Sequence, residues 1–118
     1  MRIFRFDSEV GKPIEKFGSS NLIITRIVSF TGSVHINCFH LEAKGLVGYH
    51  QAVVPQLFLV VDGKGWVRAG DSSERQIIAK GQAAYWDKEE WHESGTDDGM
   101  TVIVVEGDTL DPMPFLKK

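Results

Sequence analysis

The chain has 118 residues, of which 42% are hydrophobic and 25% charged, and its formal net charge is −3. These values suit one globular domain with a single core and exclude a disordered chain. There is no basic block and no long apolar run, which argues against nucleic-acid binding and against a membrane-spanning segment. We therefore expect a small molecule or another subunit as partner. Cys38 is the only cysteine, so we expect a cytoplasmic protein in which this thiol is buried.

Short β-strands separated by turn residues are predicted along the whole chain. Residues 2–7 alternate charged and apolar side chains, which is typical of a strand. Residues 22–30 and 34–43 are rich in β-branched residues and flank a Thr-Gly-Ser turn, so they predict a hairpin. Further strands are expected at residues 56–62, 66–69, 75–79, 82–86 and 100–106. No long helix is predicted, so the fold is all-β, a sandwich or a barrel.

The strand at residues 56–62 is apolar on both faces and ends at Gly63-Lys64-Gly65, which we interpret as a tight turn. A small barrel has one interior, so the outer face of this strand needs a cover. That cover is either a tail of the same chain or a second subunit, and we predict a homodimer. Residues 108–118 contain two prolines and are expected to wrap the surface of the single domain, residues 1–118.

Two segments carry the residues best suited to bind a ligand. Residues 45–63 place His50 on a loop and Gln56 at the head of the apolar strand, and residues 81–96 contain His92. The order and spacing of these residues resemble the two sequence motifs of the cupins, a family of small jelly-roll proteins. The resemblance covers most of the chain and predicts that both motifs meet in one pocket.

The match to the cupin motifs is incomplete. Ala52 stands where the first motif has its second histidine, and Gln56 stands where it has a glutamate. In the second motif, Asp87 and Glu89 replace the usual proline and glycine, and Thr96 replaces an asparagine. The pocket implied by the resemblance therefore lacks two of the family's usual ligands.

What the resemblance implies is a double-stranded β-helix, or jelly-roll barrel, with a divalent metal at its open mouth. His50, Gln56 and His92 would be the ligands, and zinc, nickel, iron or manganese the candidate ions; no nucleotide or organic cofactor is implied. A neutral donor set offsets less of the charge of a dication than a set with a carboxylate does. The alternative is that Gln56 hydrogen-bonds a histidine in a polar pocket without metal.

Several further residues are candidates for the pocket. His40 and Glu42 would join it if their face of the strand at residues 34–43 looks inward, whereas His35, on the opposite face, is less suited. Trp86 would form a wall or fill the core. The remaining candidates are Phe58, Val60, Ser94 beside His92, and Tyr49, which would gate the mouth or lie on the surface.

Three functions remain open from the sequence. The first is a metal-dependent enzyme acting on a small organic substrate by oxygenation, isomerisation or decarboxylation. The second is a binding or sensing module that holds a small ligand without turnover, and the third is a barrel that acts only through its dimer surface. No single residue is singled out as catalytic.

Overall fold

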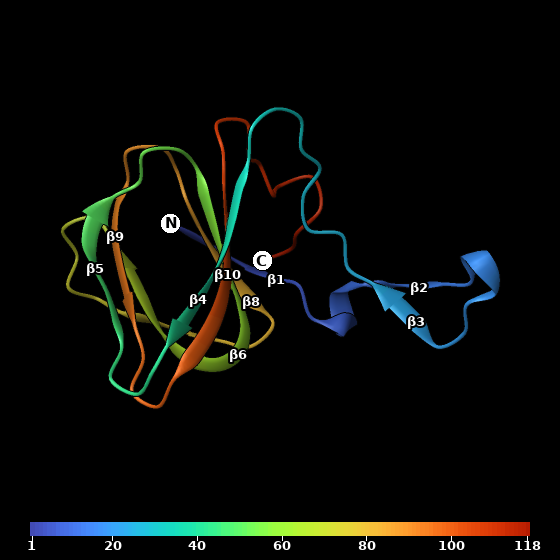
Figure 1. The fold of residues 1–118 in the computed structure, drawn as a ribbon, viewed down its shortest axis with the longest axis horizontal. Coiled ribbons are helices and arrows are strands. Elements are labelled where there is room, and N and C mark those ends of the chain that lie inside the picture. Colours follow the sequence, from blue (N-terminus) through green and yellow to red (C-terminus); the bar gives the residue numbers. More distant parts are fainter.

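A computed structural model describes all residues, 1–118, and confirms an all-β chain (Figure 1). Two short 3-10 helices, η1 (Ser8–Val10) and η2 (Lys16–Gly18), interrupt the strands. No helix has the length and apolar character needed to cross a membrane. The strands are β1 (Arg2–Arg5), β2 (Lys12–Ile14), β3 (Leu22–Ile24), β4 (His35–Leu41), β5 (Leu46–Gln51), β6 (Gln56–Ala69), β7 (Gln76–Ala79), β8 (Gln82–Trp86), β9 (Trp91–Gly95) and β10 (Met100–Glu106).

Strand β6 belongs to both layers of the barrel. Its first half pairs with β8 and β10, and its second half pairs with β7 and β9. The tight turn predicted at residues 63–65 is therefore wrong, because these residues lie inside one 14-residue strand. A side chain at Gly63 or Gly65 would collide with backbone at Gly99 or Gly95. The glycines thus serve a close crossing of strands rather than a hairpin.

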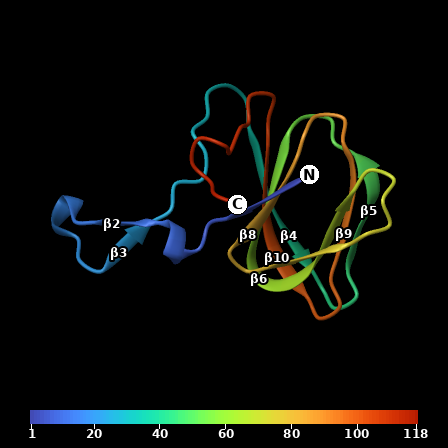
Figure 2. The same cartoon turned by 180° about the vertical axis from the view of Figure 1, so that it is seen from behind.

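The two layers enclose an apolar interior. One layer follows the order β1-β8-β6-β10-β4, and β5, β9 and β7 complete the other (Figures 1 and 2). β4 pairs only with β10 and β5 only with β9, so no backbone hydrogen bonds join β4 to β5. The buried interior residues are Phe58, Val60, Val67, Ile78, Ala84, Trp86, Met100, Val102 and Val104. Burying each of the larger ones contributes about 1.5–3 kcal/mol.

Other segments of the same chain cover the outer face of β6. Leu57 and Leu59 are buried there in a second apolar cluster. Leu110 and Leu116 of the C-terminal tail belong to this cluster, and the segment after β3 packs against it. The apolar outer face that motivated a homodimer is thus covered within one chain, and the homodimer stays a prediction without that support.

A hairpin of β2 and β3 forms an arm that projects from the barrel (Figures 1 and 2). The predicted pairing of residues 22–30 with residues 34–43 is wrong, because β3 pairs with β2 and β4 pairs with β10. The physical reason is that Ile27, Val28 and Phe30 leave the strand pattern and pack onto the outer cluster. The arm raises the radius of gyration to 14.8 Å, against about 13.5 Å for a compact chain of this length.

Cys38 is exposed, so the predicted buried thiol is wrong. The residue lies opposite Ile103, on the outward face of β4. That strand is at the edge of its layer, and no other element covers this part of it.

Candidate functional site

The two histidines of the motif segments lie side by side in the structure. Strands β5 and β9 pair antiparallel, and their register sets His50 opposite His92. The ring centroids are 4.3 Å apart, with an interplanar angle of 61°. His50 lies on a strand rather than on the predicted loop, and its pairing after an irregularity between Val47 and His50 sets it against His92.

Trp86 extends the two imidazoles into a stack of three rings. Its ring lies 4.1 Å from that of His92, with the planes only 19° apart, and Phe58 packs edge-on against it. Trp86 is 0% exposed and His92 1% exposed. Phe58 and Val60 belong to the same interior cluster, and Ser94 is buried on the strand of His92. The predicted residues at the base of the pocket therefore form a tightly packed floor.

Two buried nitrogens of this stack have no hydrogen-bond partner. Nδ1 of His92 lies 3.1 Å from the carbonyl oxygen of Glu90 and must donate to it, which leaves Nε2 as an acceptor without a donor. The indole Nε1 of Trp86 is a donor without an acceptor. Each unsatisfied group costs about 1–3 kcal/mol. The stacked geometry prevents the two groups from satisfying each other.

Burial sets the charge of His92. It lowers the pKa of His92 below its ordinary value of 6.5, and the nearby His50 lowers it further, although the Glu90 carbonyl acts in the opposite direction. Desolvation prevails because the ring is almost fully buried. His92 is therefore a neutral imidazole at neutral pH.

A cavity of about 330 Å³ opens beside the stack, and His50 is the only one of the three rings that lines it. Gln56 also lines it and donates from Nε2 to Oε2 of Glu106, at 2.9 Å. The complete lining is His35, His50, Gln51, Ala52, Val53, Val54, Gln56 and Glu106.

Sequence reasoning missed Glu106 as a pocket residue and ranked His35 below His40. Alternation along β10 was the available signal, because Met100, Val102 and Val104 all point into the interior and Glu106 shares their face. Alternation does not predict that β10 pairs with β4, and this pairing sets His35 opposite Glu106.

Three residues predicted for the pocket lie away from both the cavity and the ring stack. Tyr49 stacks on Trp91 on the outer side of β5, with ring centroids 5.2 Å apart. His40 pairs with Thr101 on the outward face of β4, and Glu42 is exposed in the turn after this strand. The face of β4 that looks inward is the one that carries His35, because its partners on β10 are interior residues.

The donor set does not fit a divalent metal. At no point of the chain do three side chains of His, Cys, Asp or Glu come close enough to hold one metal ion. Ala52 offers no ligand, and the amide nitrogen of Gln56 is directed to Glu106. Two imidazoles alone fall short of the three or four protein ligands that metal sites use.

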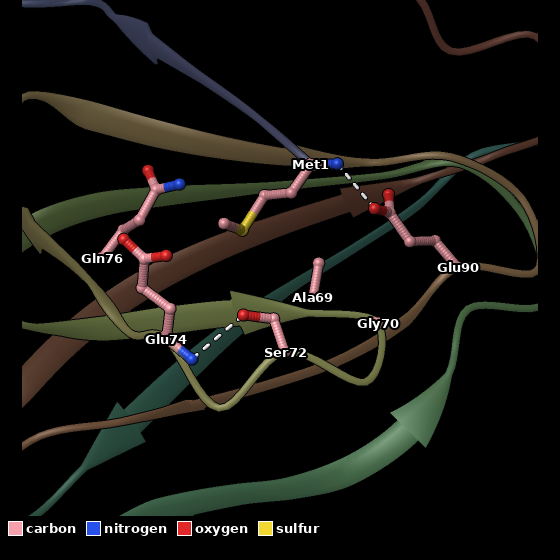
Figure 3. A pocket seen from close by; sticks show the side chains of 7 residues that line it. All are labelled: Met1, Ala69, Gly70, Ser72, Glu74, Gln76 and Glu90. Atoms are coloured by element: carbon pink, nitrogen blue, oxygen red, sulfur yellow. Dashed lines mark hydrogen bonds and ion pairs between the residues drawn. The ribbon is translucent and has the colours of Figure 1, made fainter.

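A second cavity, of about 320 Å³, is shown in Figure 3 and lies beside the loop between β6 and β7. Glu90 on its wall is paired with the amino group of Met1, and the backbone N–H of Glu74 donates to the hydroxyl of Ser72. None of the residues predicted from the motifs lines it. Its lining is Met1, Ala69, Gly70, Ser72, Glu74, Gln76 and Glu90.

Comparison with known proteins bears on the fold. No family model and no curated protein sequence matches the chain. A cupin superfamily protein of Desulfitobacterium hafniense superposes with a TM-score of 0.60 at 11% identity, over 76% of this chain and 81% of the other. A cupin family protein of Methanocaldococcus jannaschii, described as a double-stranded β-helix, gives 0.60 at 15% identity, over 73% and 75%. The chain has the cupin fold.

A cupin of Shewanella frigidimarina supports the same conclusion, with a TM-score of 0.58 at 14% identity over 70% of this chain and 69% of the other. The cupin resemblance of the two motif segments is thus confirmed at the level of the fold. Identities this low carry no statement about activity, because the cupin fold supports many unrelated functions.

Proposed function

We propose that this cupin-fold chain binds a small organic molecule in the cavity beside His50, without a metal. The observation that carries the proposal is the convergence of four polar side chains from four strands on one cavity. These residues are His35, His50, Gln56 and Glu106. Gln51 and the apolar residues Ala52, Val53 and Val54 form the rest of the wall, and about 330 Å³ is within the range of small-molecule sites.

The position of His50 adds support. It links the cavity to the buried stack, because it lines the cavity and touches the buried His92. Its Nδ1 lies 2.6 Å from the carbonyl oxygen of Gly48 in its own strand, so no distant element locks the ring. A rotation of His50 would uncover the ring of His92, which carries one of the two unsatisfied nitrogens and stacks on the ring that carries the other. A ligand that satisfies both would recover the cost of leaving them unpaired.

The test is a fragment screen by two-dimensional NMR on the full chain, which maps each hit by its shift changes. Val53 is exposed on the wall of the cavity, so Val53→Trp blocks the mouth without disturbing the core. Ile77→Trp, at an exposed position on β7, is the matched control. We expect hits at the cavity that Val53→Trp abolishes and Ile77→Trp retains. Hits confined to other surfaces, or unaffected by Val53→Trp, would refute the proposal.

A metal-dependent enzyme is the second candidate, favoured by the pairing of His50 with His92. The present donor set does not fit a metal, so this candidate requires a rearranged site. Elemental analysis of untagged protein distinguishes the two proposals. A stoichiometric transition metal that is lost in both His50→Ala and His92→Ala would favour the enzyme. If these substitutions leave the metal content unchanged, the metal-dependent enzyme is refuted.

A further inference from the structure

A row of four paired side chains lies across neighbouring strands, and three of the four line the cavity. The antiparallel register sets His35 of β4 opposite Glu106 of β10, Glu106 opposite Gln56 of β6, and Gln56 opposite Trp86 of β8. Paired residues of a ladder point to the same face of the sheet. Trp86 is an interior residue, so the whole row faces into the barrel.

Glu106 is the only acidic residue in this lining, and no lysine or arginine accompanies it. Gln56 supplies a neutral hydrogen bond to one of its oxygens, Oε2, at 2.9 Å. A carboxylate can accept about four hydrogen bonds, so Glu106 keeps most of its capacity for a ligand. The rim thus carries a carboxylate that has no lysine or arginine partner in the lining.

The chemistry of this rim selects between classes of ligand. An ammonium group would form a charge-assisted hydrogen bond with the carboxylate, roughly twice as strong as a neutral one. A carboxylate or a phosphate would meet a like charge at Glu106. The apolar wall of Ala52, Val53 and Val54 suits a hydrocarbon body attached to the polar group.

We propose that His35, Glu106 and Gln56 make the barrel mouth selective for small organic amines, with Glu106 as the residue that determines this specificity. The inference rests on the proposed function, because it names the class of ligand that the same cavity takes. Alcohols are expected to bind more weakly than amines, and carboxylates least of all.

The experiment uses three probes that share one hydrocarbon body, namely benzylamine, benzyl alcohol and benzoate. Each is titrated into the full chain at pH 7, and the dissociation constant is taken from shift changes of cavity residues. Glu106→Gln removes the charge but keeps an oxygen that can accept from Gln56. Glu74→Gln removes the same charge from the other cavity and controls for general attraction of amines to an acidic protein.

We expect benzylamine to bind more tightly than benzyl alcohol, and benzoate to bind least. Glu106→Gln should weaken benzylamine about tenfold, the factor that corresponds to loss of one hydrogen bond to a charged group. Glu74→Gln should change this constant by less than about twofold, as for a surface change away from the site.

Two kinds of failure can be told apart. Amine selectivity is overturned if benzoate binds as tightly as benzylamine. It is also overturned if Glu106→Gln and Glu74→Gln change the dissociation constant of benzylamine equally. Either result leaves the binding proposal standing. The same holds if the fragment screen finds ligands in the cavity and none is an amine. If no fragment of any class reaches the cavity, both proposals fall.

Discussion

Trp86, His92 and His50 form a stack of rings in which two buried nitrogens have no partner. Most buried polar groups in proteins are hydrogen-bonded, so exceptions require an explanation. Here one exception lies on His92, which contacts the ring that faces the cavity, and the other lies on Trp86, the next ring of the stack. A ligand that displaces His50 would explain them, whereas close packing alone leaves them unexplained.

Acid should destabilise the fold through His92. The pKa of this residue is lowered in the folded state, mainly by burial, from an ordinary value of 6.5. Below that value the unfolded chain binds the proton more readily, so the free energy of unfolding falls as pH decreases toward the folded pKa. Urea denaturation at pH 7.5 and pH 5.5 measures the effect.

His92→Phe is the comparison for this prediction, because it keeps a buried ring and removes the titrating group. The wild type should lose more stability between the two pH values than the variant does, by at most about 1.4 kcal/mol per pH unit. Equal losses would show that His92 contributes nothing to the pH dependence.

At the scale of elements, β6 organises the barrel because it takes part in both layers. Its middle passes so close to the backbone at Gly95 and Gly99 that only glycine fits at Gly63 and Gly65. Gly63 also has a positive φ of 79°, which costs glycine little. The crossing brings Gln56 to the cavity at one end of the strand and Ala69 beside His92 at the other.

Gly65→Ala should therefore be strongly destabilising, by at least about 2 kcal/mol, since its Cβ would meet the carbonyl of Gly95 and disturb the β6–β9 pairing. Gly48→Ala is the matched control, because a Cβ there meets no atom within 4 Å. Thermal or urea denaturation of both variants decides the point. A Gly65→Ala protein as stable as Gly48→Ala would contradict the close crossing.

At the scale of the whole molecule, the barrel has two cores. The outer cluster depends on the C-terminal tail, which supplies Leu110 and Leu116 to the face of the sheet opposite the interior. Tyr85 ties the tail down, because its hydroxyl donates to the carbonyl oxygen of Leu110 at 3.3 Å. The tail is thus part of the folded unit.

Leu110→Ala should lower the free energy of unfolding by about 2–5 kcal/mol, the usual cost of truncating a buried leucine. Met113 lies in the same tail but is exposed, so Met113→Ala should change stability little. Chemical denaturation of the two variants provides the measurement. Similar stabilities would mean that the tail does not hold the outer cluster together in solution.

The arm and strand β4 are the surfaces through which a homodimer would form. The arm exposes Leu22, Ile23, Ile24 and a 99% exposed Phe17, and a two-stranded hairpin of this kind is marginal on its own. β4 offers an unpaired edge with neither lysine nor proline to block it. In a dimer with a two-fold axis, each arm would pair with the β4 edge of the other copy. The same contact would then cover the apolar arm and the unpaired edge.

We expect light scattering at micromolar concentration to give a dimer mass for the wild type and a monomer mass for the Phe17→Asp, Ile23→Asp double variant. Val53→Asp, another exposed apolar position outside the arm, should remain dimeric. A monomeric wild type would end the dimer prediction.

By itself the sequence determined the all-β class, the cupin resemblance and the residues that meet at the floor of the site. These features depend on local alternation and on spacing within two short segments, both of which can be read directly. Trp86 illustrates this, since alternation sets it on one face with Ala84 and the cupin resemblance points that face inward, where the structure buries both.

Only the tertiary structure decided which strands pair and what covers each face. Glu106 and His35 enter the cavity through the register of β10 with β4 and β6, strands far apart in sequence. The motif residues around His50 and His92 are now part of a larger site with a carboxylate at its rim. Long-range pairing depends on how apolar surfaces compete for burial in the whole chain, and no local pattern contains that information.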